Sequence, residues 1–127
     1  MILRPASRLT PALTVALAAV LTACDDTGPG ELDVSVLGGS AAAVVALTGE
    51  GITGIEPVGG TRAYGAPGSV PGTYRVVLVG PVPGTLRFRV AVEDRSMPVP
   101  RGHVVEATDG HNQPIPVSGL EVRIEEP

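Results

Sequence analysis

The sequence is poor in aromatic residues and in cysteine. Its 127 residues include one Phe, two Tyr and no Trp, so a hydrophobic core has to be built from Val, Leu, Ile and Ala. Sugar-binding sites usually stack their ligand against flat rings, so this composition disfavours a polysaccharide platform. The only cysteine, Cys24, cannot form an internal disulfide, so its thiol is free, paired with another chain or chemically modified.

Lysine is absent, and all nine basic residues are Arg, against thirteen acidic residues. Removal of residues 1–23 would take away Arg4 and Arg8 and change the net charge from −4 to −6. The remaining 104 residues have room for one domain. An acidic chain with scattered arginines repels phosphate backbones, so we expect no nucleic acid partner.

The first 23 residues have the parts of a secretory signal peptide. Arg4 and Arg8 give a positively charged start, and residues 9–21 form an apolar run interrupted by two Thr and one Pro. This run is shorter than the roughly 20 apolar residues of a membrane-spanning helix. It therefore favours a cleaved signal peptide, with an uncleaved N-terminal anchor as the alternative.

The signal ends in Leu21, Thr22, Ala23 and Cys24, a motif that resembles the lipobox of bacterial lipoproteins. The resemblance implies that the Cys24 thiol receives a diacylglyceryl group and that a peptidase cuts before Cys24. It also implies acylation of the new amino group, for example with palmitate, and a membrane anchor in the cell envelope. The alternative is an ordinary secretory signal that leaves a free thiol. An Asp after the cysteine resembles an inner-membrane retention signal of enterobacteria, but Asp25 leaves the choice of membrane open.

Residues 24–30 are predicted to be the lipidated Cys24 and a short tether. Residues 31–127 are predicted to form one β domain. Apolar and polar residues alternate there with the period of strands that bury one face. Such half-buried strands are predicted at 32–37, 86–93 and 120–125. Segments that are apolar on both faces, and so belong nearer the middle of a sheet, are 42–48 and 74–79. Residues 104–107 are a further short strand.

Gly and Pro lie between these runs, where turns are needed. The predicted turns are Gly38-Gly39, residues 49–51, Gly59-Gly60 within a hairpin of 52–58 and 61–64, residues 80–84 between two strong strands, and Asp109-Gly110. The fold class is therefore all-β, a single antiparallel β-sandwich of seven or eight short strands, with a barrel as the alternative. The order of features is similar to small cohesin-like and immunoglobulin-like sandwich domains of bacterial surfaces, without the paired cysteines and core Trp of true immunoglobulin domains.

No pattern indicates catalysis, a metal or a cofactor. No Ser lies in a Gly-x-Ser-x-Gly elbow. A zinc site would need His103 and His111 together with Glu106 or Asp109, and we interpret both histidines as exposed residues of turns. Asp109 to Asn112 resembles the beginning of a calcium loop but lacks the remaining ligands, so a plain turn is the better interpretation. We expect a protein that is not an enzyme.

Three arginines form the most notable polar set. Arg87 and Arg89 share one face of a predicted strand, and Arg75 lies on the strand before it in the predicted hairpin. They could form a stripe that binds a carboxylate-bearing partner or lipid headgroups; the alternative is a solvated face paired with nearby Glu residues.

These features together predict a membrane-anchored envelope lipoprotein whose β-sandwich is a structural or protein-interaction module. A partner could bind it by adding a strand to a free sheet edge. The alternative function is a small-ligand or polysaccharide-binding lipoprotein.

Overall fold

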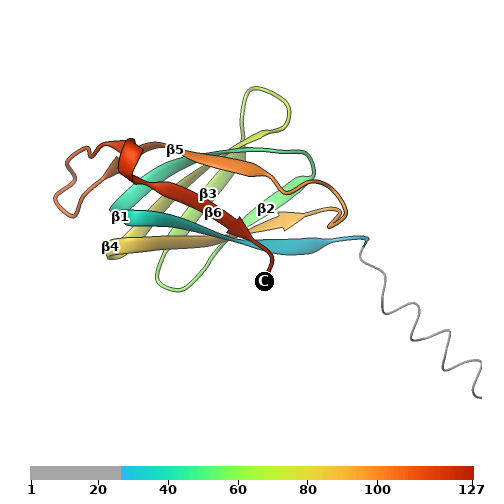
Figure 1. Cartoon of the computed structure of the whole chain (residues 1–127), viewed down its shortest axis with the longest axis horizontal. Helices are drawn as coiled ribbons and strands as arrows, with labels where there is room; N and C mark the ends of the chain where they lie inside the picture. The colour runs from blue at the N-terminus through green and yellow to red at the C-terminus, as the bar shows by residue number, and fades with distance from the viewer. Residues whose placement is uncertain (1–26) are drawn as a thin grey trace, which may run out of the picture.

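The computed structural model describes residues 27–127, and the predicted signal peptide, lipobox and Cys24 lie outside that range. The described chain forms one antiparallel sheet of six strands (Figure 1). The strands are β1 (Gly30–Thr48), β2 (Ile52–Pro57), β3 (Arg62–Pro67), β4 (Thr73–Val92), β5 (Arg101–Thr108) and β6 (Glu121–Glu125), with a short 3-10 turn, η1 (Val117–Gly119), before β6. The all-β class is confirmed. The expected seven or eight strands are wrong, because four predicted strands are joined into two long ones.

The two long strands, β1 and β4, pair with each other over almost their whole length, from Gly30 opposite Val92 to Thr48 opposite Thr73. Each changes its second neighbour half-way along. β1 pairs first with β6 and then with β5, and β4 pairs first with β3 and then with β2. The sheet therefore has two halves of four strands, which we call the β2/β6 half and the β3/β5 half.

The turns predicted at Gly38-Gly39 and at residues 80–84 are wrong, because both positions lie inside these two strands. Gly38 and Gly39 have φ angles of 120° and 87°, values that suit a turn or a bulge equally well. Here they form an irregularity in β1, and opposite it residues 80–83 of β4 fall between two residues that do pair, Val79 and Gly84. Because both strands are irregular at the same place, they bend together and the chain does not reverse.

The bend in β1 changes which residues face the core. Before it the even-numbered Val34 and Val36 are buried, and after it the odd-numbered Val45 and Leu47 are buried. If the side chains of β1 alternated strictly through the bend, Val45 and Leu47 would face away from the core. The irregularity instead keeps the apolar residues of both halves directed to one core.

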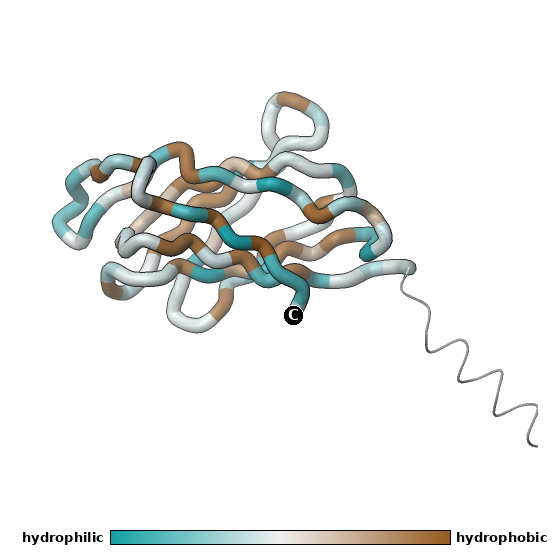
Figure 2. Tube along the Cα trace, viewed as in Figure 1, coloured by the Kyte–Doolittle hydropathy of each residue, from teal (hydrophilic) through white to brown (hydrophobic). Residues whose placement is uncertain are grey.

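That core takes side chains from both halves. Its largest fully buried members are Phe88 and Leu86 from one half and Leu47 and Leu78 from the other. Figure 1 shows the sheet as strongly curved, with β6 passing in front of β3. Figure 2 shows hydrophilic and hydrophobic residues alternating along β6, the pattern of a strand with one wet face.

At both margins of the core, a glycine of one half faces a β-branched side chain of the other. Gly65 of β3 lies against Ile55 of β2, where a Cβ atom would clash. A Cβ atom on Gly102 of β5 would lie 2.8 Å from Cγ1 of Val122 in β6. The inner faces of the two halves therefore touch at both margins.

The Gly59-Gly60 turn lies where it was predicted, closed by the N–H of Thr61 donating to the carbonyl of Val58 at 3.3 Å. The hairpin around it is wrong, because β2 and β3 pair with opposite ends of β4. The turn thus carries the chain from one half of the sheet to the other. The predicted strands at 104–107 and 120–125 are confirmed as β5 and β6. Within residues 27–127, no helix has the length and apolar character needed to cross a bilayer.

Candidate interaction surface

The two outward faces of the sheet differ in chemistry. Register places mostly charged and small residues on the outside of the β2/β6 half: Glu31, Asp33, Ser35, Glu56, Arg87, Arg89, Glu121, Arg123 and Glu125. On the outside of the β3/β5 half it places a mostly apolar set, which we call the apolar outer face: Ala42, Val44, Tyr64, Val77, Val79 and Val105. The same side also carries Glu106 opposite Val44 and His103 opposite Ala46, both on β5.

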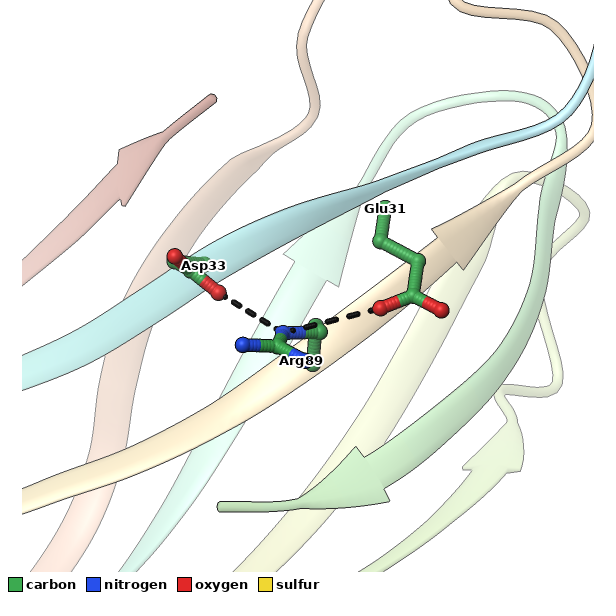
Figure 3. A network of polar contacts seen from close by, with 3 residues as sticks. All are labelled: Glu31, Asp33 and Arg89. Carbon is green, nitrogen blue, oxygen red and sulfur yellow. Dashed lines mark hydrogen bonds and ion pairs between the residues drawn. The ribbon is translucent and has the colours of Figure 1, made fainter. Parts of the chain in front are cut away.

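On the charged side, the arginine with the strongest partners is Arg89. Its Nε–H donates to Oδ1 of Asp33 at 2.9 Å, and Oε2 of Glu31 lies 3.5 Å from the same nitrogen (Figure 3). The hydrogen bond and charge of Asp33 raise the pKa of Arg89 above its ordinary value. Arg123 has similar, longer contacts with neighbouring glutamates on β6. Exposed pairs of this kind add little stability, and they indicate a solvated face.

The predicted stripe of three arginines is not assembled, because the hairpin that it required is absent. Arg75 and Arg87 lie on the same strand, β4, on opposite sides of its bend. Arg87 pairs with Ser35, whereas Arg75 pairs with Ala46 in the other half. Arg89 is engaged by carboxylates on its own half, as the alternative interpretation proposed.

The apolar outer face crosses three strands in a continuous row. Tyr64 on β3 stands opposite Val77 on β4, which stands opposite Val44 on β1. Tyr64 is 60% exposed and Val77 44% exposed, so large apolar side chains on this face meet solvent. Val79 and Val105 are also exposed beside this row.

A shallow groove of about 510 Å³ continues this face past β5. Its apolar lining includes Val44, Val77 and Val105, together with Ile115 and Val117 from the segment that follows β5. That segment is held along the strand edge, because the N–H of Ile115 donates to the carbonyl of Ala107 at 3.0 Å. The face and the groove form one mostly apolar surface, with Glu106 and Thr108 as polar residues of the groove lining.

Two arginines border the apolar outer face on its β3/β4 side. Arg62 stands opposite Val79, and Arg75 stands between Ala46 and Ala66. Both are exposed, and neither forms an ion pair within residues 27–127. The β3/β4 side of this surface therefore presents positive charge that is available to an acidic partner, whereas the β5 side carries the carboxylate of Glu106.

The apolar outer face was not predicted from the sequence, although two segments carry a signal for it. Residues 42–48 and 74–79 are apolar on both sides, which predicted a central position in the sheet. They are central, but only the inner side is covered. A run of apolar residues on both faces does not tell whether the second face is buried or left exposed for a partner.

The histidines lie apart in the fold. His103 is on the outer side of β5 opposite Ala46, so its predicted place in a turn is wrong, and His111 lies in the turn after β5. Asp109 shapes that turn: its Oδ1 accepts the N–H of Gln113 at 3.0 Å and that of His111 at 2.8 Å, which lowers the pKa of Asp109. The described residues contain no group of three or more His, Cys, Asp or Glu arranged to hold a metal ion.

No known protein family, curated protein sequence or solved structure matches the chain. The lipobox residues Leu21, Thr22 and Ala23 and the lipidation residue Cys24 lie outside the described residues.

Proposed function

We propose that the chain is a bacterial envelope lipoprotein, anchored through Cys24, whose β domain binds a protein partner through the apolar outer face. The sequence supports the anchor through the lipobox and the positively charged, apolar segment before it. The row formed by the exposed Tyr64 and Val77 and the half-buried Val44 carries the binding proposal. Contiguous exposed apolar surface of this kind marks interaction sites, because water contact with it is unfavourable.

The partner has an apolar patch flanked by carboxylates that face Arg62 and Arg75. Arginine suits this role because its planar group can bind a carboxylate through two parallel hydrogen bonds. Addition of a partner strand along the end of β5 is disfavoured, because Ile115 already bonds to Ala107 and Thr108 forms a bridge with Pro114. Binding on the face therefore fits this protein better than binding at that edge.

For the architecture, we propose that the two halves are the two layers of a β-sandwich made from one bent sheet. The contacts of Gly65 with Ile55 and of Gly102 with Val122 support this, because they join the inner faces of opposite halves. The single core cluster drawn from both halves supports it as well.

Site-specific photocrosslinking in intact envelopes tests the binding proposal. A photoreactive residue at position 77 of the full lipidated chain should give one discrete adduct, and the same residue at Arg87, exposed on the charged face, should give none. The second substitution Arg75→Glu should weaken the adduct at 77. Equal adducts at both positions, or none at 77, would contradict the proposal.

The anchor has a separate test. Cys24→Ser removes the acceptor thiol, so the protein should move from the membrane fraction to the soluble fraction and lose incorporation of labelled palmitate. A variant that stays fully membrane-bound would rule out the lipid anchor.

A second candidate function, binding of a small apolar ligand, is favoured by the groove lined by Val105, Ile115 and Val117. A ligand that binds only the folded state raises stability, so a screen of apolar compounds by thermal unfolding tests it. A stabilising compound whose effect is lost in Val117→Asp would favour this function over protein binding.

A further inference from the structure

The described chain is fastened to the domain before its first strand begins. The N–H of Arg95 donates to the carbonyl of Gly28 at 2.8 Å, and the N–H of Gly28 donates to Oδ1 of Asp94 at 3.4 Å. The same Oδ1 accepts the N–H and the hydroxyl of Ser96 at 2.9 and 2.7 Å, which fixes the carboxylate. The Arg95 side chain also lies directly over Gly30, where a Cβ atom would clash with it.

This fastening limits how far the domain can be from Cys24. Gly28 is four residues beyond Cys24, and four fully extended residues span at most about 14 Å. The headgroup layer of one leaflet is roughly 5–8 Å thick, from the difference between the whole bilayer and its hydrocarbon core. A lipid on Cys24 would therefore hold Gly28 and the loop bonded to it within a short distance of the headgroups.

The loop that holds Gly28 carries apolar side chains. Met97, Pro98 and Val99 follow Arg95, and Val99 is 50% exposed. With Gly30 and Leu32 they line a cavity of 470 Å³ at this end of the molecule. The charged groups beside it, Glu31, Glu50, Asp94, Arg95 and Glu126, are mostly acidic. This chemistry suits the interface of zwitterionic lipids better than a strongly anionic surface.

We infer that the end of the domain formed by Gly28, Gly30 and residues 94–99, the anchor end, lies against the bilayer, with Val99 in the headgroup region. The inference rests on the proposed lipid anchor. The opposite end, which includes Val82 at the bend of β4, is then directed away from the membrane. Ser40, which lies at the bend of β1, is ten positions along the strand from Gly30, about 30 Å of strand. Figure 1 shows the start of β1 at one end of the molecule and the connection from β5 to β6 at the other.

The absence of Trp from the chain allows a direct test. Val99→Trp and Val82→Trp each place one fluorophore at an exposed position, the first at the anchor end and the second at the far end. The full lipidated variants are reconstituted into phosphatidylcholine vesicles with brominated acyl chains, which quench nearby Trp. We expect V99W emission to be blue-shifted and quenched at least two-fold more than that of V82W.

Vesicle flotation, measured on the same samples, separates the two proposals. Failure of both variants to float would overturn the lipid anchor and this inference together. Flotation with equal quenching at the two positions, or with no quenching at 99, would overturn the orientation alone. Six Gly/Ser residues inserted between Asp26 and Thr27 should leave flotation unchanged and reduce V99W quenching, because the fastening at Gly28 no longer sets the distance from the lipid. Unchanged quenching in this variant would also overturn the inference.

Discussion

At the scale of single residues, Ser40 is the polar group whose environment is least favourable. It is fully buried at the bend of β1, and its hydroxyl has no hydrogen-bond partner within residues 27–127. A buried hydroxyl without a partner costs about 1–3 kcal/mol. We expect Ser40→Ala to raise the free energy of unfolding by about 1 kcal/mol in urea denaturation. A decrease in stability would show that the hydroxyl is needed at the bend.

Two aspartates make the fold sensitive to acid. Hydrogen bonds from the Ser96 hydroxyl and N–H lower the pKa of Asp94, and those from Gln113 and His111 lower that of Asp109. A carboxylate whose pKa is lower in the folded state stabilises the protein fully above its unfolded pKa, near 3.9. That stabilisation is lost as the pH falls through the folded pKa.

The melting temperature should therefore fall on acidification below about pH 4. The double variant Asp94→Asn and Asp109→Asn should show a smaller fall in thermal unfolding followed by circular dichroism. Glu106→Gln, at an exposed position on β5, serves as the control. An unchanged acid response in the double variant would show that other carboxylates dominate.

At the scale of elements, the glycines at the core margins determine how closely the two halves approach. A methyl group at position 102 would press on Val122, so we expect Gly102→Ala to lower the free energy of unfolding by about 1–3 kcal/mol. The double variant Gly102→Ala with Val122→Ala should recover part of that loss, measured as a double-mutant cycle. Gly54→Ala, where no atom lies within 4 Å, is the control. The absence of coupling between positions 102 and 122 would contradict a sandwich contact.

The strands themselves could be predicted from the sequence, but their continuity and partners could not. Alternation placed β6 close to where it lies, a short apolar run placed β5, and the Asp-Gly pair placed the turn at Asp109-Gly110. The turn predicted at Gly38-Gly39 was wrong because positive φ angles suit turns and bulges equally well. The local sequence does not distinguish the two. Gly59-Gly60 was located correctly, yet pairing of β2 and β3 with β4 depends on residues far along the chain. The predicted arginine stripe was wrong because it required a hairpin between residues 74–79 and 86–93, which are instead parts of one strand, β4.

At the scale of the whole molecule, the domain has one core and two outer surfaces of different character. Leu78 and Val77 are adjacent on β4, but Leu78 is fully buried and Val77 is 44% exposed. Leu78→Ala should lower the free energy of unfolding by about 2–5 kcal/mol. Val77→Thr keeps the branched Cβ on the exposed face and should change it by less than about 1 kcal/mol. Chemical denaturation compares the two, and equal losses would show that the outer face is packed.

The long central strand also determines the order in which the fold can assemble. Within residues 27–127, the partners of β1 are β4, β5 and β6, so none of these ladder bonds can form before the chain has been made beyond residue 73. Contacts between residues so distant in sequence form late, because a large loop must close first. Until then a 19-residue strand rich in Val, Leu and Ala remains without a partner and open to association with other chains. The time between synthesis of β1 and arrival of β4 is therefore the interval in which this protein is most exposed to aggregation.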